Sequence, residues 1–560
     1  LSCGLNSITV TVRTPTNETK SYTIRVIRMC GFTVSPSDTT ICAGDSATLR
    51  AINDETEATF KWYDSQTGGT LLYTGNNYTV FPASTTNYYV SKTILGTESE
   101  RTEVRVILMS RSIADGITIT GNTEICYGMN TVLNASAANV TNPIYRWYNS
   151  QTEVTPFYTS SSYTTSNLTS DTTFYVSVEG NNYCENDTGN RKSVMLEILR
   201  FGANGKVYVT KTGAGNKDGS SWANACAGLA VPLVVAQKTC SGIKEIWVAR
   251  GIYHPLHKAG SGTSDKDNSF VLVAGVKIYG GFAGTETLLS ERNLAQNPSI
   301  LSGDNSYHTV ISAGSMISGT DTARLDGFVI RNGKANDSGT ITVNGQSISA
   351  NSGGGIYFAN SAPNIVNVEI KGSEASASGG GIYANNSSPK LINVVVSGNL
   401  SASGGGIYLN GGSPALTNIT VSGNIAATSG GGIYMNSSSP QIGNSIVWGN
   451  AAGSNNNVYS TSGSPAYQYS LIQDLNPSGA GNMDGTNPSN DPVFVLPIPA
   501  SNAPTIDGDY RLQLGSPVLN AGNNALNREP TDIESNPRIQ ESKIELGAYE
   551  VNYNFECNCE

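Results

Sequence analysis

Four evenly spaced tyrosines are the residues of this sequence best suited to contact a ligand. Each ends a copy of Gly-Gly-Gly-Ile-Tyr, and the copies fall 26, 25 and 26 residues apart, at Tyr357, Tyr383, Tyr408 and Tyr434. On strands, alternation would place them opposite the preceding isoleucine, as an outward ladder. Aromatic rings can stack on sugar rings, or they can stack on one another under shielding loops. The sequence leaves both interpretations open, a glycan-binding strip and a structural stack.

Acid–base chemistry has few candidates in the same stretch. A lyase needs a basic side chain and often Ca²⁺ held by carboxylates, whereas a hydrolase needs two carboxyls at a defined separation. Between positions 341 and 473 the only charged residues are Glu369, Lys371, Glu374 and Lys390. We expect Glu369 and Glu374 to be solvated charges at the edge of a coil, and we assign no catalytic residue.

A second group of charged residues precedes the repeats and could build a small site. This group contains Asp304, Arg324, Asp326, Arg331, Lys334 and Asp337, with His308 nearby. We expect these residues to be turn formers or exposed charges.

No pattern indicates a metal or a cofactor. The three histidines do not cluster with the cysteines, no Cys-x-x-Cys pair occurs, and Asp265 and Asp267 lack EF-hand spacing. We therefore expect no cofactor and no metal. The nine cysteines instead predict disulfides and an exported protein. Cys226 and Cys240 bracket an apolar helical stretch and are predicted to staple it.

The elements that must position the tyrosines are the coils of a repeat architecture. A second phrase, Pro-x-apolar-x-Asn, follows each tyrosine and ends at Asn367, Asn393, Asn418 and Asn444. Period-two alternation breaks at each asparagine, which predicts a corner there. Strand, corner, strand and a Gly-Asn turn make one coil of a parallel β-helix. Coils stack at roughly 4.8 Å, so equivalent asparagines can form a hydrogen-bonded ladder.

Two copies of one smaller module precede the repeats. The segment around Trp62 matches the segment around Trp147, and other matching phrases lie at offsets of 84 to 86 residues. A central tryptophan among short alternating strands predicts an immunoglobulin-like sandwich, and the modules are expected to act mainly as spacers. Ahead of them, two alternating strands joined by a Thr-Pro-Thr-Asn turn predict a hairpin.

Several of these segments resemble known families. Residues 206 to about 450 resemble the right-handed parallel β-helix family that has the pectate-lyase-like fold and the repeats of polymorphic outer-membrane proteins. The Glu545-Leu-Gly-Ala-Tyr-Glu550 phrase resembles closing segments of such β-helices. The paired modules resemble Ig-like modules of Bacteroidetes-type secreted surface adhesins, and the hairpin resembles the last strands of a cadherin-like β-sandwich. The Ig resemblance implies that Cys126 pairs with Cys184, which leaves Cys42 to another partner such as Cys30.

The predicted fold is all-β: immunoglobulin-like sandwiches followed by a right-handed parallel β-helix with a short N-terminal capping helix. The predicted parts are a cadherin-like hairpin, two Ig-like domains, the β-helix and its closing segment, spanning residues 1–29, 30–110, 111–199, 200–500 and 501–560 respectively.

Composition narrows the class of partner. Charged residues make up 14% of the chain and the net charge is −10, which argues against nucleic acids and anionic membranes because both attract clustered cations. No apolar run approaches the roughly 20 residues of a membrane span. The expected partners are a polysaccharide or surface glycan and other domains of the same, larger protein.

The function predicted from these features is that of a non-catalytic adhesin or stalk segment at an extracellular bacterial cell surface. The Bacteroidetes-type resemblance implies passage through the outer membrane by type IX secretion. A polysaccharide lyase or hydrolase of pectate-lyase-like fold is the alternative, and a purely structural filament or spacer is a third.

Overall fold

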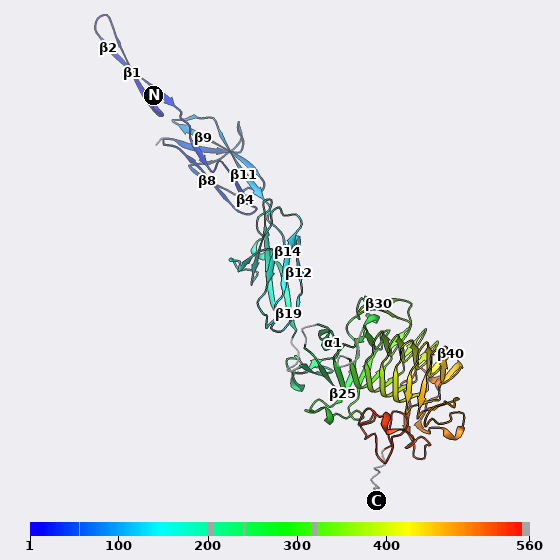
Figure 1. Cartoon of the computed structure of the whole chain (residues 1–560). Helices are drawn as coiled ribbons and strands as arrows, with labels where there is room; N and C mark the ends of the chain where they lie inside the picture. The colour runs from blue at the N-terminus through cyan, green and yellow to red at the C-terminus, as the bar shows by residue number, and fades with distance from the viewer. Residues whose placement is uncertain (55–56, 200–204, 239–241, 315–321, 552–560) are drawn as a thin grey trace. The chain divides into compact units, whose positions relative to one another are not determined.

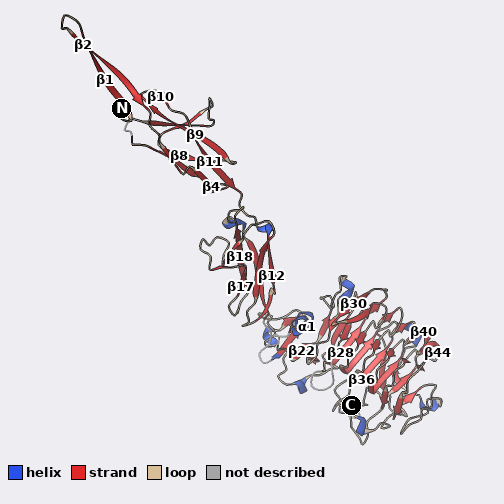
Figure 2. Cartoon of the chain, turned by 45° about the horizontal axis from the view of Figure 1, so that its top comes forward, coloured by secondary structure: helices blue, strands red, loops and turns tan. Residues whose placement is uncertain are grey.

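The computed structural model describes residues 1–54, 57–199, 205–238, 242–314 and 322–551 (Figure 1). Two compact units emerge, Leu1–Leu199 and Arg200–Glu560. Strands dominate both units, and the described residues contain one α-helix, α1 (Ala230–Ala236), beside short 3-10 turns (Figure 2). The predicted all-β class is therefore confirmed.

The first unit begins with the predicted hairpin. Strands β1 (Gly4–Arg13) and β2 (Thr19–Arg28) pair antiparallel along their whole length, and a disulfide between Cys3 and Cys30 closes the open end. One face of the ribbon is apolar and exposed, with Ile8, Val10 and Ile24 between 40% and 52% accessible.

The first Ig-like domain packs two sheets around Trp62. Its strands are β3 (Thr33–Ser35), β4 (Asp38–Cys42), β5 (Ala47–Ile52), β6 (Thr59–Tyr63), β7 (Leu71–Thr74), β8 (Asn77–Val80), β9 (Thr86–Ile94), β10 (Thr97–Glu98) and β11 (Thr102–Met109). One sheet has the order β4-β11-β9-β6-β7, with β10 beside β9, and the other has the order β3-β5-β8. Trp62 is fully buried, and its indole N–H donates to the Gly75 carbonyl at 3.0 Å.

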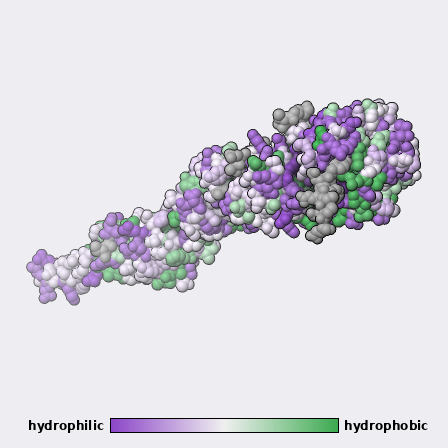
Figure 3. All heavy atoms as spheres, turned by 90° about the horizontal axis from the view of Figure 1, so that it is seen from below, coloured by the Kyte–Doolittle hydropathy of each residue, from purple (hydrophilic) through white to green (hydrophobic). Residues whose placement is uncertain are grey.

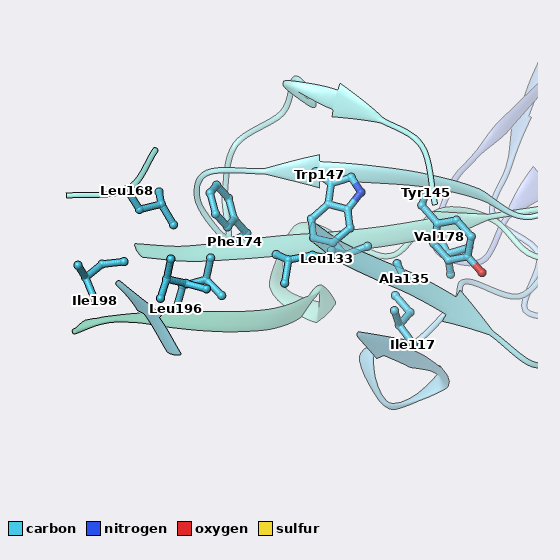
Figure 4. Close-up of a cluster of buried hydrophobic side chains, with 12 residues drawn as sticks. Ile117, Leu133, Ala135, Tyr145, Trp147, Leu168, Phe174, Val178, Leu196 and Ile198 are labelled. Atoms are coloured by element: carbon cyan, nitrogen blue, oxygen red, sulfur yellow. The ribbon is translucent and has the colours of Figure 1, made fainter. Parts of the chain in front are cut away.

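The second Ig-like domain repeats this plan around Trp147. Its strands are β12 (Ile117–Gly121), β13 (Glu124–Cys126), β14 (Val132–Ala137), β15 (Ile144–Tyr148), β16 (Tyr158–Thr159), β17 (Ser162–Thr164), β18 (Thr172–Glu179) and β19 (Lys192–Leu199). Figure 4 shows Trp147 among Leu133, Phe174 and other apolar side chains of the core. Its indole N–H donates to Ser160, again 13 residues further on. The duplicated module predicted from sequence is thus reproduced down to the tryptophan hydrogen bond.

A covalent bond joins the two Ig-like domains. Cys42 of the first domain forms a disulfide with Cys184 of the second, with Cα atoms 5.9 Å apart. Arg111, at the junction, forms ion pairs with Asp45 at 2.8 Å and with Asp187 at 3.1 Å. The joint is therefore held by a disulfide and a guanidinium that contacts both domains.

The predicted disulfide between Cys126 and Cys184 is wrong, and so is the alternative between Cys30 and Cys42. Cys184 lies where the chain enters the second domain, paired with Arg111. Cys126 instead aligns with the end of β19, where the chain leaves that domain, and it takes part in a different disulfide. The two thiols are at opposite ends of the sandwich, so they cannot meet.

The second unit is a parallel β-helix with three sheets, drawn from green to orange in Figure 1. The long sheet has the order β21-β20-β22-β25-β28-β33-β36-β39-β42-β46, with β23, β26, β43 and β47 beside it. Its strands are β20 (Lys206–Thr210), β21 (Cys226–Ala227), β22 (Glu245–Ala249), β23 (Gly251–Tyr253), β25 (Lys277–Phe282), β26 (Ser299–Ser302), β28 (Arg324–Arg331), β33 (Asn364–Lys371), β36 (Lys390–Ser397), β39 (Ala415–Ser422), β42 (Gln441–Gly443), β43 (Ile446–Trp448), β46 (Ala466–Gln468) and β47 (Leu471–Ile472).

The other two sheets complete each coil. The seven-stranded sheet, named the tyrosine sheet here, contains β24 (Phe270–Val271), β27 (Val310–Ala313), β32 (Ile356–Ala359), β35 (Ile382–Asn385), β38 (Ile407–Asn410), β41 (Ile433–Asn436) and β45 (Val458–Ser460). The five-stranded short sheet contains β29 (Lys334–Ala335), β34 (Glu374–Ala375), β37 (Leu400–Ser401), β40 (Ile425–Ser429) and β44 (Ala451–Ser454).

The asparagine corner of each coil is confirmed. Asn367, Asn393, Asn418 and Asn444 have φ between 51° and 54°, a left-handed conformation that asparagine tolerates better than other residues with a side chain. The Asn393 amide donates to Asn367 at 2.9 Å, and Asn418 donates to Asn393 at 3.0 Å. A second, fully buried ladder links Asn399, Asn424 and Asn450 with amide contacts of 2.9 Å.

The glycine triplets have a steric explanation. In the coil of β38, Gly404 has a φ of +63°, and a Cβ on Gly405 would lie 2.3 Å from the carbonyl oxygen of Ile425 in the next coil. The first glycine therefore serves the turn, whereas the second permits close stacking of coils.

A helix caps the first coils. Leu233 and Val235 of α1 are buried. The predicted staple does not form, because Cys226 is a free, buried thiol; Cys240 lies outside the described residues. Without this disulfide, the capping helix is held by the packing of its buried apolar side chains.

A closing segment, residues 473–551, covers one outer face of the long sheet. It contains β48 (Phe494–Leu496) and β49 (Asp509–Leu512). Tyr510 and Leu546 of the segment pack against Val395 and Ile446 of the β-helix. The segment therefore forms a second apolar core with the outer face of the long sheet.

Charged side chains are buried inside the closing segment. Arg538 and Glu550 form an ion pair of 3.2 Å with side chains 0% and 2% exposed. Glu545 and Asp532 are also buried. Burial and the neighbouring Glu545 raise the pKa of Glu550 to about 8, although Arg538 opposes this shift.

Candidate ligand-binding face of the β-helix

The predicted tyrosines lie in one row on the outer face of the tyrosine sheet. Strand register aligns Tyr357 with Tyr383, Tyr383 with Tyr408, and Tyr408 with Tyr434. The isoleucines that precede them are fully buried in the β-helix interior. The predicted alternation is therefore confirmed.

The beginning of this row is aliphatic and covered. Val271 and Ile311 occupy the two positions before Tyr357. A hairpin of β30 (Thr340–Val343) and β31 (Gln346–Ser349) packs over these three residues through Val343 and Ile348. Tyr357 is consequently 3% exposed, so the loop-shielded alternative describes this residue, which is not available to a glycan.

One further tyrosine extends the row at its other end. Tyr459 aligns with Tyr434 and is half-buried, like Tyr383, Tyr408 and Tyr434. Its motif reads Asn-Asn-Asn-Val-Tyr, so a search for triple glycine misses it. The signal that could have found it is the spacing of 25 residues from Tyr434. Asn455 replaces the first glycine and keeps its left-handed backbone, with φ of 51°.

The tyrosine rings contact one another along the row. Successive ring centroids lie 4.9, 5.5, 4.5 and 5.1 Å apart from Tyr357 to Tyr459, and the Tyr408 and Tyr434 rings are nearly parallel at 8°. The Tyr408 and Tyr434 rings thus cover each other's faces, whereas the other pairs are tilted or edge-on. Because the rings contact one another, hydrogen bonding through the hydroxyls is favoured over face-on stacking with a ligand.

A second row of polar side chains runs beside the tyrosines. The Asn410 amide donates to Asn385 at 2.9 Å, Asn436 donates to Asn410 at 2.9 Å, and the Thr461 hydroxyl donates to Asn436 at 2.9 Å. The three asparagines are half-buried. Each exposed coil therefore offers a phenol and an amide or hydroxyl at a repeat of roughly 4.8 Å.

This face is uncharged. Burial, with smaller effects from the neighbouring tyrosines, raises the pKa of Tyr408 to about 12, so its hydroxyl stays protonated at neutral pH. Burial also raises the pKa of Tyr383. Neutral donors and acceptors in a regular array suit hydroxyl-rich, uncharged ligands.

The charged residues considered for catalysis form two separate ion pairs. Glu369 contacts Lys371 at 2.5 Å, whereas Glu374 contacts Lys334 at 2.9 Å. The two carboxylates thus belong to different pairs. Glu369 also accepts a hydrogen bond from Tyr549 of the closing segment.

The group before the repeats is likewise engaged. Asp326 is fully buried between Arg292 at 2.8 Å and Arg324 at 2.6 Å. His308 is buried, its Nδ1 lies 3.0 Å from the Gly353 carbonyl, and burial lowers its pKa to about 4. Asp337 accepts from Tyr307 at 2.7 Å. The described residues contain no group of three His, Cys, Asp or Glu side chains that could hold a metal.

Comparison with protein families agrees with both parts of the fold. Residues 32–109 and 116–199 match the model of the CHU_C-associated Ig-like domain, and residues 316–472 match that of the right-handed β-helix region. This is a protein of Ig-like domains and a right-handed β-helix. Such domains, together with the disulfides, indicate an extracellular structural or adhesin-like protein. Searching the described residues for membrane-spanning helices finds none that is long and apolar enough.

Several solved structures are similar to part of this chain. DIP-gamma IG1+IG2 is 13% identical, with 29% of this chain covering 93% of it and a TM-score of 0.14. Murine CEACAM1b is 15% identical, with 30% covering 98% and a TM-score of 0.17. The three N-terminal domains of the bacteriophage RB49 Hoc capsid protein are 16% identical, with 32% covering 64% and a TM-score of 0.18. No curated protein matches the sequence.

Proposed function

We propose that this protein is a non-catalytic cell-surface adhesin or stalk segment that binds neutral glycans through the exposed part of the tyrosine sheet. The binding face consists of Tyr383, Tyr408, Tyr434 and Tyr459 with the parallel row of Asn385, Asn410, Asn436 and Thr461. Export by the type IX route through an outer membrane belongs to the same proposal and rests on the resemblance of the Ig-like modules.

One observation carries the proposal. Where the hairpin of β30 and β31 covers the tyrosine sheet, the outer row contains Val271, Ile311 and the buried Tyr357. Where the sheet is uncovered, the row contains tyrosines flanked by asparagines. The position beside the covered Tyr357 is Ala359, whereas the position beside Tyr383, where the cover ends, is Asn385. The flanking residue thus changes from apolar to hydrogen-bonding where protein cover ends, which is expected if a polar ligand replaces that cover.

The geometry also fits an extended glycan. The coil repeat is roughly 4.8 Å, close to the length of one sugar residue in an extended chain. A chain lying along the β-helix axis could therefore meet one phenol and one amide at each coil. Repetition gives avidity from individually weak hydrogen bonds.

The test is affinity electrophoresis of the full chain through gels containing neutral polysaccharides. Replacing the hydroxyls with Tyr408→Phe and Tyr434→Phe preserves the ring stack, so retardation should be lost while the protein stays folded. The control is Tyr73→Phe with Tyr158→Phe, which removes two hydroxyls from tyrosines that are each 43% exposed in the Ig-like domains. Equal retardation of the wild type and of the Tyr408→Phe, Tyr434→Phe variant would refute glycan binding at this face. Shortening of the polymer would instead favour a lyase or hydrolase.

A further inference from the structure

The last coil of the β-helix ends in a strand edge without a partner. In each of the four preceding coils, an isoleucine of the tyrosine sheet donates its backbone N–H to the next coil at 2.8 or 2.9 Å, from Ile356, Ile382, Ile407 and Ile433. Val458 of β45 occupies the same position in the last coil. Asn457 and Thr461 bond back to β41, so the backbone groups of Val458 and Ser460 face the other way. Among the described residues, no strand follows β45 in this sheet.

The other two sheets are closed at the same end. In the short sheet, the outward N–H of Ala452 on β44 donates to the side-chain oxygen of Asn456 at 2.9 Å. In the long sheet, Met483 aligns with Leu471 as a further strand would, and its backbone N–H donates to the Ser470 carbonyl at 3.0 Å. Figure 2 labels β44 at this end of the stack. Within the described part of the chain, only the tyrosine sheet is left open here.

This edge has none of the usual protection against another strand. Natural sheet edges are protected by charges, prolines or covering segments. From Gln441 to Ser464 the sequence contains neither a charged residue nor a proline. Val458 is half-buried, whereas the four isoleucines before it are fully buried, so the apolar interior is also partly open at this edge. An added strand would satisfy the backbone groups and cover the interior.

The hairpin of β1 and β2 has the surfaces that such an edge requires. One face of the ribbon carries four apolar side chains that are 40% to 52% exposed, at Ile8, Val10, Tyr22 and Ile24. The described residues add no third strand to the ribbon, so both of its edges are free. Most of the surface in view in Figure 3 is hydrophilic or neutral, and a contiguous apolar face of this kind marks an interaction surface.

The backbone of the hairpin can meet β45 with its apolar face turned inward. Thr14 donates its backbone N–H to the Glu18 carbonyl at 2.9 Å, and bonded and non-bonded pairs alternate along an antiparallel ribbon. The two residues that flank Val10 therefore direct their backbone groups outward from β1. A parallel strand would bond to Val458 through two such flanking residues. Parallel pairing, which all strands of the tyrosine sheet use, would thus align Val10 with Val458 and turn the apolar face toward the open interior.

The two surfaces also have opposite charge. The hairpin has one acid, Glu18, and four basic residues, at Arg13, Lys20, Arg25 and Arg28. Residues 391–510, which include the last coils, contain five aspartates and no Lys or Arg. One of them, Asp474, lies beside the last coil and accepts from the Asn457 amide at 3.2 Å. In a chain of net charge −10, a basic ribbon suits this acidic end and favours a second copy of the chain as the partner.

We propose that the hairpin of one copy docks on the β45 edge of a second copy, so that the chains assemble head to tail. Strand β1 of the first copy extends the tyrosine sheet of the second as a parallel strand. The contact joins two different surfaces, so it can repeat along an open row of copies. This assembly goes beyond the proposed glycan face and does not depend on it, because the contact uses backbone groups and apolar side chains.

The test is sedimentation velocity of the full chain over a series of concentrations. The wild type should form oligomers that grow with concentration. Ile8→Asn with Ile24→Asn removes apolar contacts, and Ser460→Pro removes an outward N–H from the edge. Each change should weaken association by at least about tenfold.

Matched controls separate the contact from general effects of substitution. Thr9→Asn with Thr23→Asn alters an opposed pair on the polar face of the hairpin, and Ser460→Ala keeps the outward N–H. Both control variants should assemble like the wild type. Thermal unfolding of every variant establishes that the fold is intact.

Mixing the two defective variants decides which surfaces meet. Equal amounts of the Ile8→Asn, Ile24→Asn variant and the Ser460→Pro variant should form a dimer and nothing larger, because one intact hairpin meets one intact edge. Undiminished self-association of the hairpin variant would indicate edge-to-edge pairing, and that of the Ser460→Pro variant would indicate pairing between hairpins. Either result would overturn the proposal, as would a wild type that stays monomeric at all concentrations.

Discussion

Removing the disulfide between the two Ig-like domains should strongly destabilise both of them. The perturbation is Cys42→Ser with Cys184→Ser, which leaves Arg111 and its ion pairs in place. Cys184 lies beside Arg111 at the junction, and Cys42 lies beside Met109, at the end of the first domain. Each cysteine is thus held close to the point where the chain passes between domains.

This placement sets the magnitude. If one domain unfolds while the other stays folded, the disulfide closes a loop of roughly 70 residues in the unfolded domain, and loop entropy then gives about 4 kcal/mol. Unfolding of both domains closes a loop spanning the sequence separation of 142 residues. The corresponding value is about 5 kcal/mol. For domains of this size, about 4 kcal/mol corresponds to a fall in Tm of at least about 15 °C.

Differential scanning calorimetry of the full chain measures the effect under non-reducing conditions. The Ig transitions should move down together, because the same bond constrains both domains. Cys3→Ser with Cys30→Ser is the control, since that disulfide closes only the hairpin and should leave the Ig transitions unchanged. A decrease below about 1 kcal/mol in both transitions would refute the loop argument.

Two further predictions concern the second unit. Asn424→Ala should lower the free energy of unfolding in urea by about 3 kcal/mol, because the buried backbone N–H of Asn399 loses its acceptor. Asn436→Ala, in the half-buried row beside the tyrosines, should lower it by about 1 kcal/mol or less. Equal losses in the two variants would contradict the burial argument. The raised pKa of Glu550, caused by burial and by Glu545, makes its stabilising contribution complete below about pH 4.5, and this contribution falls as the pH rises through about 8. Glu550→Gln should therefore flatten the decrease in Tm between about pH 5 and about pH 9, and an unchanged slope would contradict the assignment.

Local patterns in the sequence determined the β-helix. Period-two alternation placed the isoleucines inside and the tyrosines outside, because strand geometry leaves only two faces. The corner at Asn367 and its equivalents was predicted because alternation broke there, and the left-handed backbone at those positions agrees. The repeated segment around Trp62 and Trp147 likewise predicted two sandwiches, since a large apolar side chain between short strands must be buried.

Tertiary structure alone decided which of these residues are available. Tyr357 has the same motif as Tyr383, yet the hairpin of β30 and β31 buries it, and nothing in its own repeat encodes that cover. Tyr459 has a different motif yet joins the row, because asparagine can replace glycine in a left-handed turn. Residue type thus predicted the ladder, whereas packing of a distant segment set its accessible length.

Pairings between distant segments were also beyond the sequence. Nine cysteines allow many combinations, and the domain resemblance favoured a bond within one sandwich. The actual partner of Cys184 is Cys42 of the preceding domain, because the junction brings these two ends together. The cover over the long sheet has the same origin, since Val395 and Tyr510 belong to segments that meet only when the closing segment packs on the coils. Sequence periodicity determines the local backbone conformation and the face of the sheet on which each side chain lies. Contacts between segments that are remote in the sequence depend instead on how the whole chain packs.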